Sequence, residues 1–371
     1  NLKILITGQE GFIGYHLYNT IKFSLPDIEI INFEKKLFQT QNDLDKTLSR
    51  VDIIIHLAGV NRAQNESYVL KKNLIITDKL INSLSRINFS GKLIFASSTQ
   101  HSDNNPYGNS KKLSTEKFFK ASKNNNFTFI NLIIPNVFGP FCKPNYNSFI
   151  ATFCHNEING IPNNVEGNNQ VSLIYIDNLV DIIIEKFQTD ISTDFLIKED
   201  IKIKVEDVKK IIEDYNKKYF LDGNIPNLDS NFKMNLFTTF HSYINSEKHF
   251  PKNHNLISDT RGSFSEVIRF ESSGQVSYSL TKPKKTRGNH FHTRKIERFT
   301  VIQGEALIRT RKIGSNKINT YKLNGKNPSY VDMKVWYTHS IENIGSSTLI
   351  SMFWINEFYN ENDSDTFFEK V

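Results

Sequence analysis

Cysteine is scarce in this sequence: only Cys142 and Cys154 occur among 371 residues. Two cysteines cannot build the disulfide framework of a small secreted protein, so we expect reduced thiols in a cytoplasmic protein. Long apolar runs are also missing. No hydrophobic stretch approaches the roughly 18 residues that a membrane-spanning helix needs, so we predict no membrane segment. Residues 2–7 are expected to form a strand and not a signal peptide.

The sequence also lacks a basic stripe, although its net charge at pH 7 is +7. Adjacent lysines occur only as scattered pairs, for example at positions 35–36, 111–112 and 284–285. Nucleic-acid-binding proteins usually gather basic side chains on one face, so we predict no nucleic-acid partner. An anionic small substrate is compatible with the charge, and a solvated lysine-rich surface explains it more simply. The length is sufficient for two domains with separate cores.

A set of potential metal ligands lies in the C-terminal third of the chain. His290 and His292 are two residues apart, so on a strand they would point to the same face. Glu297 is expected on the same strand or just past it, and residues 301–304 are typical of a strand end and a turn. His339 offers a third imidazole. Three imidazoles and a carboxylate suit Zn²⁺, and ordinary surface or core histidines are the alternative.

This pattern resembles the metal-binding motifs of the cupin family. The second motif of that family matches at His339 and Asn343, but Lys334 stands where Pro is usual and Trp336 where Gly is usual. The missing glycine makes the local turn an open question, and the indole is expected to narrow the mouth of a pocket. The first motif, His-x-His-x4-Glu-x6-Gly, matches at all four positions: His290, His292, Glu297 and Gly304.

The N-terminal part has the pattern of a dinucleotide-binding fold. A short apolar strand at residues 2–6 precedes a glycine-rich turn, and an amphipathic helix is expected from about Phe12. Glycines at this place let the backbone approach a pyrophosphate, and the helix N-terminus offers it N–H groups. A plain tight turn is the alternative. The glycines concerned are Gly8, Gly11 and Gly14.

Strands and helices then alternate, which predicts a parallel, doubly wound α/β sheet of the Rossmann type. Glu34, after the second strand, could hold a ribose hydroxyl, whereas Lys35 and Lys36 could hold a 2′-phosphate, so this position leaves NAD or NADP open. The expected strands cover residues 28–33, 51–57, 92–96 and 128–134, and the expected helices cover residues 68–84 and 107–121.

A tyrosine and a lysine follow the fourth expected strand. Tyr107 and Lys111 are four residues apart and so share one helix face. The ammonium charge is expected to lower the pKa of the phenol. Such a tyrosine can donate a proton to a carbonyl oxygen that Ser98 also holds through a hydrogen bond. We predict that Ser98, Tyr107 and Lys111 are catalytic, with an ordinary exposed helix pair as the alternative.

These features resemble the extended short-chain dehydrogenase/reductases over about residues 1–245. In that family nucleotide sugars are the usual substrates. Thr99 and Gln100 occupy the place where its 4,6-dehydratases carry an Asp-Glu pair, so dehydration is not expected. The resemblance implies that the cofactor is also bound outside the glycine turn, by Leu57, Ala58 and Lys111. Three further segments support it: residues 56–59, 135–139 and 174–177.

Beyond about residue 245 the pattern changes to short strands separated by Gly- and Asn-rich turns, which predicts an all-β sandwich or small barrel. Residues 221–229 and 246–254 are rich in Asn, Pro, Asp and Lys, and they place the domain boundary here. Residues 259–266 resemble a segment of the cupin epimerases that act on 4-keto nucleotide sugars. The predicted domains are a dehydrogenase/reductase domain at residues 1–245 and a cupin domain at residues 246–371.

The combination resembles, along the whole chain, the CapF-type bifunctional enzymes of capsular polysaccharide biosynthesis. It implies two steps on UDP-2-acetamido-2,6-dideoxy-4-hexulose: C3 epimerisation in the cupin, then NADPH-dependent C4 reduction to UDP-2-acetamido-2,6-dideoxy-talose. A homodimer is also expected. The segments that carry this resemblance are residues 58–62, 105–108, 142–148, 288–290 and 337–339.

Two other classes of function stay open at this stage. One is a UDP-sugar 4-reductase or 4-epimerase whose cupin is only a metal-stabilised dimerisation module, and the other is a reductase fused to a sugar-binding cupin. The metal is expected to have a mainly structural or positioning role, with a Lewis acid for an enolate as the alternative. Tyr337 and Lys285 flank the ligands in sequence and are provisional candidates for proton transfer.

Overall fold

The computed structural model describes most of the chain, and its contacts divide the chain into two compact units. The first unit comprises Asn1–Thr152 and Asn168–Val205, and the second comprises Phe153–Gly167 and Glu206–Val371. The described residues are 1–61, 66–102, 105–165, 167, 169–254, 256–259, 262–265, 267–268, 271, 274–357 and 360–371.

A six-stranded sheet with parallel pairing throughout forms the centre of the first unit. Its order is β2-β1-β3-β4-β5-β8, so the chain reverses its direction across the sheet at β1. In such folds ligands bind at this switch point, beyond the carboxyl ends of the strands. The strands are β1 (Lys3–Thr7), β2 (Glu29–Ile31), β3 (Ile53–His56), β4 (Lys92–Ser98), β5 (Thr128–Ile134) and β8 (Thr193–Leu196).

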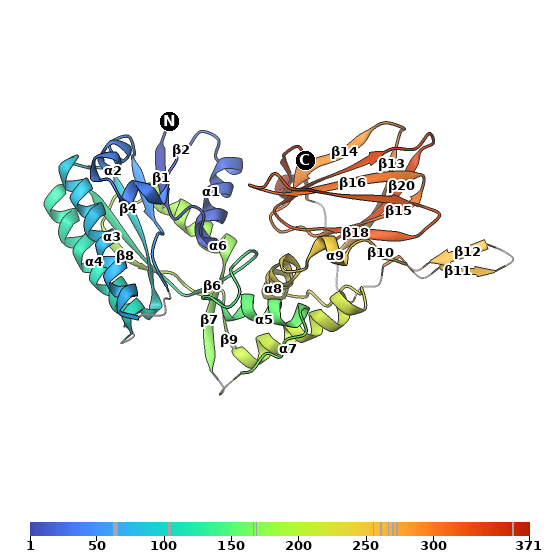
Figure 1. Ribbon diagram of the computed structural model, residues 1–371, viewed down its shortest axis with the longest axis horizontal. Helices are drawn as coiled ribbons and strands as arrows, with labels where there is room; N and C mark the ends of the chain where they lie inside the picture. The colour runs from blue at the N-terminus through green and yellow to red at the C-terminus, as the bar shows by residue number, and fades with distance from the viewer. Residues whose placement is uncertain are drawn as a thin grey trace. The chain divides into compact units, whose positions relative to one another are not determined.

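Helices join these strands, and α3 and α4 lie side by side along the sheet (Figure 1). Strands β3 and β4 are buried almost throughout because side chains pack on them from both sides, which fits their runs of Ile, Leu and Phe. The helices are α1 (Phe12–Ser24), η1 (Lys35–Phe38), α2 (Gln41–Leu48), α3 (Glu66–Arg86), η2 (Thr99–Ser102), α4 (Pro106–Asn125), α6 (Ile176–Glu185) and η3 (Lys186–Gln188). Helix α5 (Phe149–Ile158) begins in this unit and continues into the second. A small sheet contains β6 (Asn136–Phe138), β7 (Gln170–Tyr175) and β9 (Ile201–Lys204).

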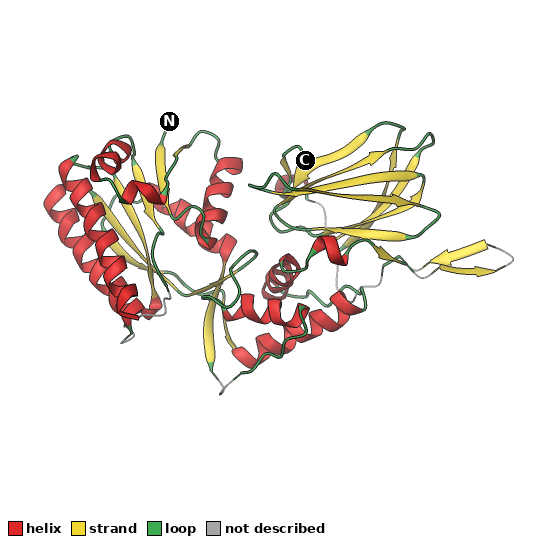
Figure 2. Ribbon diagram, in the orientation of Figure 1, coloured by secondary structure: helices red, strands yellow, loops and turns green. Residues whose placement is uncertain are grey.

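The second unit contains two five-stranded antiparallel sheets, drawn as yellow arrows in Figure 2. The first has the order β10-β18-β15-β20-β13, and the second has the order β17-β16-β19-β14-β21. The predicted fold class, a parallel α/β sheet followed by an antiparallel β region, is confirmed. The strands are β10 (Lys252–Asn253), β13 (Gln275–Thr281), β14 (Thr286–Phe291), β15 (Glu297–Gln303), β16 (Glu305–Lys312), β17 (Ile318–Asn324), β18 (Ser329–Met333), β19 (Tyr337–Asn343), β20 (Leu349–Ile355) and β21 (Phe367–Phe368).

Short helical segments precede these sheets in the second unit. They are α7 (Val205–Tyr215), the π-helix η4 (Asn216–Leu221), α8 (Asn231–Ser242) and α9 (Ser246–His249). A separate hairpin is formed by β11 (Leu256–Asp259) and β12 (Gly262–Ser265), and η5 (Glu361–Asp363) precedes β21. The end of β11 and all of β12 fall in the segment 259–266 that resembles cupin epimerases, and positions 260, 261 and 266 of that segment lie outside the described residues.

A buried polar network joins the helical segments to the sheets within this unit. Arg298 on β15 forms two hydrogen bonds with Asp332 on β18, at 2.8 and 3.1 Å. Tyr219 of η4 donates its hydroxyl to the same carboxylate, and Arg298 also donates to the Gly223 carbonyl at 2.7 Å. Residues 206–245 therefore pack with the strands that follow them. The domain boundary at residue 245, which rests on composition and on family resemblance, stays a prediction.

Lys334, one of the two departures from the cupin motif, takes part in the same packing. Its ammonium donates to the carbonyl oxygens of Ser242, the last residue of α8, and of Ile244, two residues further on. The last carbonyls of a helix need partners from outside it, and a lysine commonly supplies one. Burial lowers the pKa of Lys334 to about 7. The cupin motif usually has a rigid proline at this position. Here hydrogen bonds from the lysine side chain to the end of α8 and the residues after it hold the chain instead.

Candidate functional site

The glycine turn between β1 and α1 is as tight as the sequence predicts. Gly8 has φ +79°, and a Cβ at Gly14 would lie 2.1 Å from the Gly8 carbonyl oxygen, so no larger residue fits there. The Gly11 N–H donates to that carbonyl at 2.9 Å. Gly11 is also the N-cap of α1 and has no side chain to occupy the N–H groups of the first turn. This turn can accept a phosphate group.

A pocket of about 870 Å³ opens at this turn, at the switch point of the parallel sheet. Two buried polar atoms that line it, Gln9 Oε1 and Ser97 Oγ, have no hydrogen-bond partner among the described residues. Such atoms usually bond to a ligand or to water. The pocket therefore fits a dinucleotide. It brings together all the residues that were predicted for the cofactor and for catalysis in this part of the chain: Gly8, Gly11, Gly14, Leu57, Ala58, Ser98, Tyr107 and Lys111.

Helix α4 presents the predicted tyrosine and lysine to this pocket from its first turns. Asn105 caps the helix by accepting the Gly108 N–H at 2.8 Å, and Pro106 occupies the first helical position. Lys111 Nζ lies 5.6 Å from the centre of the Tyr107 ring and donates to the Ala96 carbonyl of β4 at 2.6 Å. The two side chains thus share one face, as the spacing predicts.

The expectation that Lys111 lowers the pKa of Tyr107 is wrong for the ligand-free protein. Burial raises the pKa of the phenol to about 12, and Tyr146 adds to this rise. Burial also lowers the pKa of Lys111 to about 8. Removal from water disfavours the charged form of each group, so it raises the pKa of the phenol and lowers that of the amine. At neutral pH the phenol keeps its proton and the lysine stays charged.

The sequence did not indicate several other residues that line this pocket. Tyr146 and Lys143 line it, and Lys143 Nζ lies 5.6 Å from the centre of the Tyr146 ring. Both belong to the segment 142–148, which carried part of the family resemblance but no assigned role. Gln9 and Ser97 were passed over because each is the unremarkable neighbour of a motif residue.

The charged residues at the start of η1 differ in whether they line the pocket. Lys35 lines the pocket, as do Lys72 and Lys79 of α3. Glu34 instead pairs with Lys36 at 2.7 Å, and both side chains are more than half exposed. The sequence alone left open whether Glu34 or the lysines beside it face the cofactor. In the structure Lys35 lines the pocket, and Glu34 pairs with Lys36.

The predicted metal ligands converge in the second unit. One ligand atom from each of the four residues lies within 4.8 Å of those of the others: His290, His292, Glu297 and His339. Glu297 Oε2 lies 3.3 Å from Nε2 of His292 and 3.0 Å from Nε2 of His339. Two ligands on one tetrahedral zinc are about 3.3 Å apart when each bond is about 2.0 Å. The four residues fit a zinc ion.

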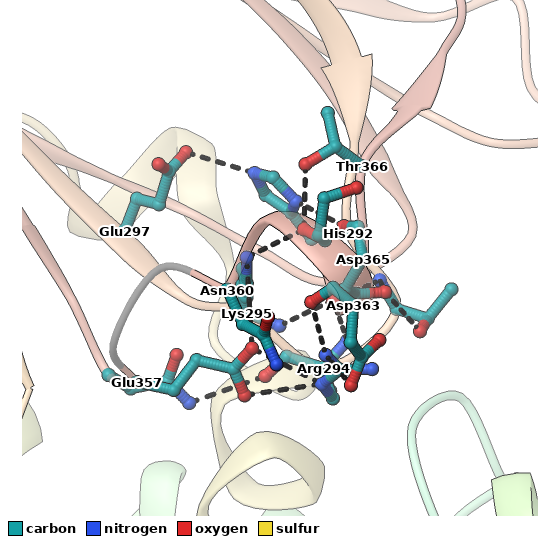
Figure 3. A network of polar contacts seen from close by, with 12 residues as sticks. His292, Arg294, Lys295, Glu297, Glu357, Asn360, Asp363, Asp365 and Thr366 are labelled. Atoms are coloured by element: carbon teal, nitrogen blue, oxygen red, sulfur yellow. Dashed lines mark hydrogen bonds and ion pairs between the residues drawn. The ribbon is translucent and has the colours of Figure 1, made fainter.

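The orientation of two imidazoles supports this fit. His292 Nδ1 donates to the Asp365 carbonyl at 2.6 Å, and His339 Nδ1 lies 3.3 Å from the Tyr337 carbonyl (Figure 3 shows the first). Because a carbonyl only accepts, Nδ1 of each ring carries a proton, and in the neutral ring Nε2 then carries the lone pair. Burial also lowers the pKa of His290 to about 4, which keeps that ring neutral.

Two sequence expectations about this region need correction. Glu297 is on neither the strand of His290 nor its immediate end: β14 ends at Phe291, and Glu297 opens β15. Trp336 does not narrow a pocket mouth, because it is 1% exposed and stacks on Phe291 with ring centres 5.5 Å apart. It nevertheless keeps the turn that glycine makes in the motif, since its φ is +58°.

The two candidates for proton transfer differ in position. Tyr337 is two residues before His339 on β19, so both side chains are on one face, and burial raises the pKa of Tyr337. Lys285 is exposed, and its carbonyl bonds to the N–H of Asn343. That position is four residues along β19 from His339, roughly 13 Å away. Lys285 is therefore no longer a candidate.

Fold and pocket define a nicotinamide-nucleotide enzyme with an appended antiparallel β region. The chain belongs to the NAD-dependent epimerase/dehydratase family, whose model matches residues 4–195. Residues 257–367 match the polysaccharide biosynthesis C-terminal domain. No helix among the described residues has the length and apolarity to span a membrane.

Full-length relatives place the chain within this family. It is 30% identical to a UDP-2-acetamido-2,6-beta-L-arabino-hexul-4-ose reductase of Pseudomonas aeruginosa, over 99% of this chain and 98% of the relative. It resembles the crystal structure of CapF, a capsular polysaccharide assembling protein of Staphylococcus aureus, with 32% identity, a TM-score of 0.63 and full coverage of both chains. The predicted resemblance to CapF-type enzymes is confirmed. A UDP-N-acetylglucosamine 4-epimerase of Bacillus cereus shares the fold over 58% of this chain and 82% of its own, with 22% identity and a TM-score of 0.51.

Proposed function

We propose that this chain is a bifunctional nucleotide-sugar enzyme of capsular polysaccharide biosynthesis. The cupin domain, residues 246–371, epimerises C3 of UDP-2-acetamido-2,6-dideoxy-4-hexulose. The dehydrogenase/reductase domain, residues 1–245, then reduces C4 with NADPH to give UDP-2-acetamido-2,6-dideoxy-talose. The observation that carries the proposal is the match, along the whole chain, to a reductase of a UDP-linked 4-keto sugar.

The reduction step uses the pocket of the first unit. When bound, NADPH supplies a hydride to C4 of the keto sugar. Tyr107 donates the phenolic proton to the C4 oxygen, which is possible because its pKa of about 12 keeps it protonated. Ser98, at the end of β4, donates a hydrogen bond to the same oxygen. Lys111 stays charged at neutral pH and stabilises the phenolate that the transfer leaves behind.

The epimerisation step relies on the acidity that a 4-keto group gives to the C3 hydrogen. A base removes this proton, and the electron pair is delocalised onto the C4 oxygen as an enolate. A proton returned from the opposite face inverts C3, so no oxidant or reductant is consumed. Tyr337 is our candidate for one of these transfers, because its side chain is on the face of His339. Reduction of C4 then draws the epimerisation forward.

The coenzyme we propose is NADPH, and the lysines of the pocket support this choice. Lys35, Lys72 and Lys79 line it, whereas Glu34, which would favour a ribose hydroxyl, is paired with Lys36. A 2′-phosphate is an anion, so lysines stabilise it and a free carboxylate would repel it.

We propose Zn²⁺ at the four-ligand group, with a mainly structural or positioning role. Three imidazoles and a carboxylate can close a tetrahedral shell, which is typical of structural zinc. In His290→Gln, metal content and thermal stability should both fall, because binding energy here is also folding energy. Metal analysis and a thermal melt on one preparation test this. Retention of a full equivalent of metal would show that the ligand set is wrong.

A second candidate function shares the reductase but not the epimerase. In it the β region is only a metal-stabilised dimerisation or sugar-binding module, as a closed four-ligand shell would allow. A homodimer itself fits the exposed apolar side chains along one face of edge strand β13: Val276 (42% exposed), Tyr278 (72%) and Leu280 (54%). A cytoplasmic location fits the nucleotide-sugar substrate and the buried thiols of Cys142 and Cys154.

The reductase activity is tested by adding UDP-2-acetamido-2,6-dideoxy-4-hexulose to the wild-type protein with NADPH. We expect absorbance at 340 nm to fall and NMR to show the hydrogen newly bonded to C4 of the product. Tyr107→Phe should remove this activity, since the variant has no phenolic proton to donate. Oxidation of NADPH at the wild-type rate by Tyr107→Phe would contradict the assigned role.

A further inference from the structure

The segment 360–371 packs against the loop that follows His292 and is bound to it through Asp365. The Asp365 carboxylate accepts the backbone N–H groups of Thr293, Arg294 and Lys295 at 3.0 to 3.2 Å. It also accepts the Thr293 hydroxyl at 2.6 Å. Asp365 is 7% exposed, so these bonds are made out of water (Figure 3). One carboxylate thus fixes three successive peptide groups.

The same residue reaches the metal group through its backbone. The Asp365 carbonyl accepts the Nδ1 proton of His292 at 2.6 Å, and His292 is 4% exposed. This bond selects the tautomer that leaves Nε2 free toward Glu297. Asp365 has φ +42°, a conformation that costs energy in a residue other than glycine. The bonds of its own carboxylate hold it there.

The segment continues as β21, which adds an edge strand beside the one that carries His290. His290 pairs with Phe368 and Phe291 with Phe367, and the last two rings stack with centres 5.3 Å apart. The Glu369 N–H donates to the Asn289 carbonyl at 2.9 Å. Strand β14, which carries His290, is thus held by β19 on one side and by β21 on the other.

We propose that Asp365 is a positioning residue of the metal centre and that the segment 360–371 is part of that centre. The inference rests on the zinc site proposed above. Asp365 supplies no ligand. Its carboxylate anchors the segment, its carbonyl orients the His292 imidazole, and β21 supports the strand of His290. Loss of the carboxylate should release the carbonyl and let the imidazole turn or change tautomer.

A matched control lies two residues away in the same segment. The Asp363 carboxylate pairs with Arg294 Nη2 at 2.8 Å, and its side chain is 64% exposed. Asp363→Ala thus removes a carboxylate from the segment without touching the peptide groups or the carbonyl at His292. Asp365→Ala removes the anchor. Asp365→Asn keeps the shape and one acceptor oxygen but not the charge.

The test measures zinc affinity of the three variants and the wild type by chelator competition on the full chain, with circular dichroism to check folding. We expect Asp365→Ala to bind Zn²⁺ about 10- to 100-fold more weakly, as is typical when the partner of a metal-bound histidine is lost. Asp365→Asn should fall between it and the wild type, and Asp363→Ala should equal the wild type. The Co²⁺-substituted protein should show altered d–d absorption for Asp365→Ala alone.

Each other result has a separate meaning. Wild-type affinity and cobalt spectrum in a folded Asp365→Ala would overturn the role of Asp365 and leave the zinc site intact. An equal loss of affinity in Asp363→Ala would also overturn it, because any disturbance of the segment would then suffice. A wild-type protein that binds no divalent metal would overturn the zinc site itself, and the positioning role with it. If Asp365→Ala does not fold, the comparison of Asp365→Asn with Asp363→Ala decides.

Discussion

Lys111 is a buried cation whose environment serves the chemistry proposed for the pocket. Its ammonium donates to the Ala96 carbonyl and lies 4.8 Å from the centre of the Phe95 ring, so carbonyl and ring stabilise a largely buried charge. Burial still lowers its pKa to about 8. The protein thus keeps a costly charge next to Tyr107, which is typical of functional sites.

This cost predicts a pH dependence that can be measured. The unfolded chain holds the Lys111 proton up to its ordinary pKa of 10.5 and the folded chain only up to about 8. Between these values the unfolded state binds more protons, so wild-type stability rises with pH relative to Lys111→Met. The difference should change by about 3 kcal/mol between pH 8 and pH 10.5. Urea unfolding of both ligand-free proteins at the two pH values measures it, and parallel pH profiles would show that Lys111 titrates normally.

Single residues also mark the limit of what the sequence predicts. The proposed metal ligands His290, His292, Glu297 and His339 could be picked out because they match two motifs of fixed spacing. Asp365, 73 residues from His292, belongs to no motif, and only the fold brings it close. The sequence left the turn at Trp336 open because glycine is the usual residue there. In the structure the indole packs in the core, and the backbone of Trp336 adopts the left-handed conformation.

At the scale of elements, the helices and strands of the first unit follow the apolar periodicity closely. The helix predicted at residues 68–84 is α3 (Glu66–Arg86), and the one at 107–121 is α4 (Pro106–Asn125). Strand pairing could not be derived in the same way, because neighbours such as β14 and β21 are far apart in the chain. The sequence also does not reveal that Glu297 lies on a different strand from His290, because a bend between two strands leaves no clear periodicity.

The short helix η1 gives an element-scale prediction about the coenzyme. In Lys35→Gln, kcat/KM for NADPH should fall about 10-fold and kcat/KM for NADH should stay the same, because one charged contact to the 2′-phosphate contributes on the order of 1.5 kcal/mol. Lys36→Gln is the matched control, since Lys36 pairs with Glu34 away from the pocket. Steady-state kinetics with both coenzymes decide the matter. An equal loss with NADH, or better wild-type use of NADH, would contradict the NADPH proposal.

At the scale of the whole molecule, the two compact units do not coincide with the two predicted domains. The network of Arg298, Asp332 and Tyr219 lies among residues that the family division assigns to different domains. Composition placed the boundary at residue 245. Composition does not indicate whether a helix packs against the part of the chain before it or the part after it. Buried charges that must be paired explain why these helices stay with the sheets.

This network predicts a large effect from a single change. Asp332→Ala leaves the buried Arg298 guanidinium without its partner, so the free energy of unfolding should fall by about 3 to 5 kcal/mol. Asp229→Ala, which breaks an exposed pair with Lys233, should change stability little. Chemical denaturation of both variants gives the comparison. A small, similar loss in the two would mean that the network does not hold the second unit together.

The central claim is that one chain both epimerises C3 and reduces C4, and solvent deuterium tests it most directly. The 4-keto sugar nucleotide is incubated with the wild-type protein and NADPH in D₂O, and NMR of the product locates the label. We predict deuterium at C3 with the talo configuration, and C3 exchange without reduction in Tyr107→Phe, because the two steps use separate sites. A reduced product that keeps protium and its original configuration at C3 would contradict the account and leave a simple reductase.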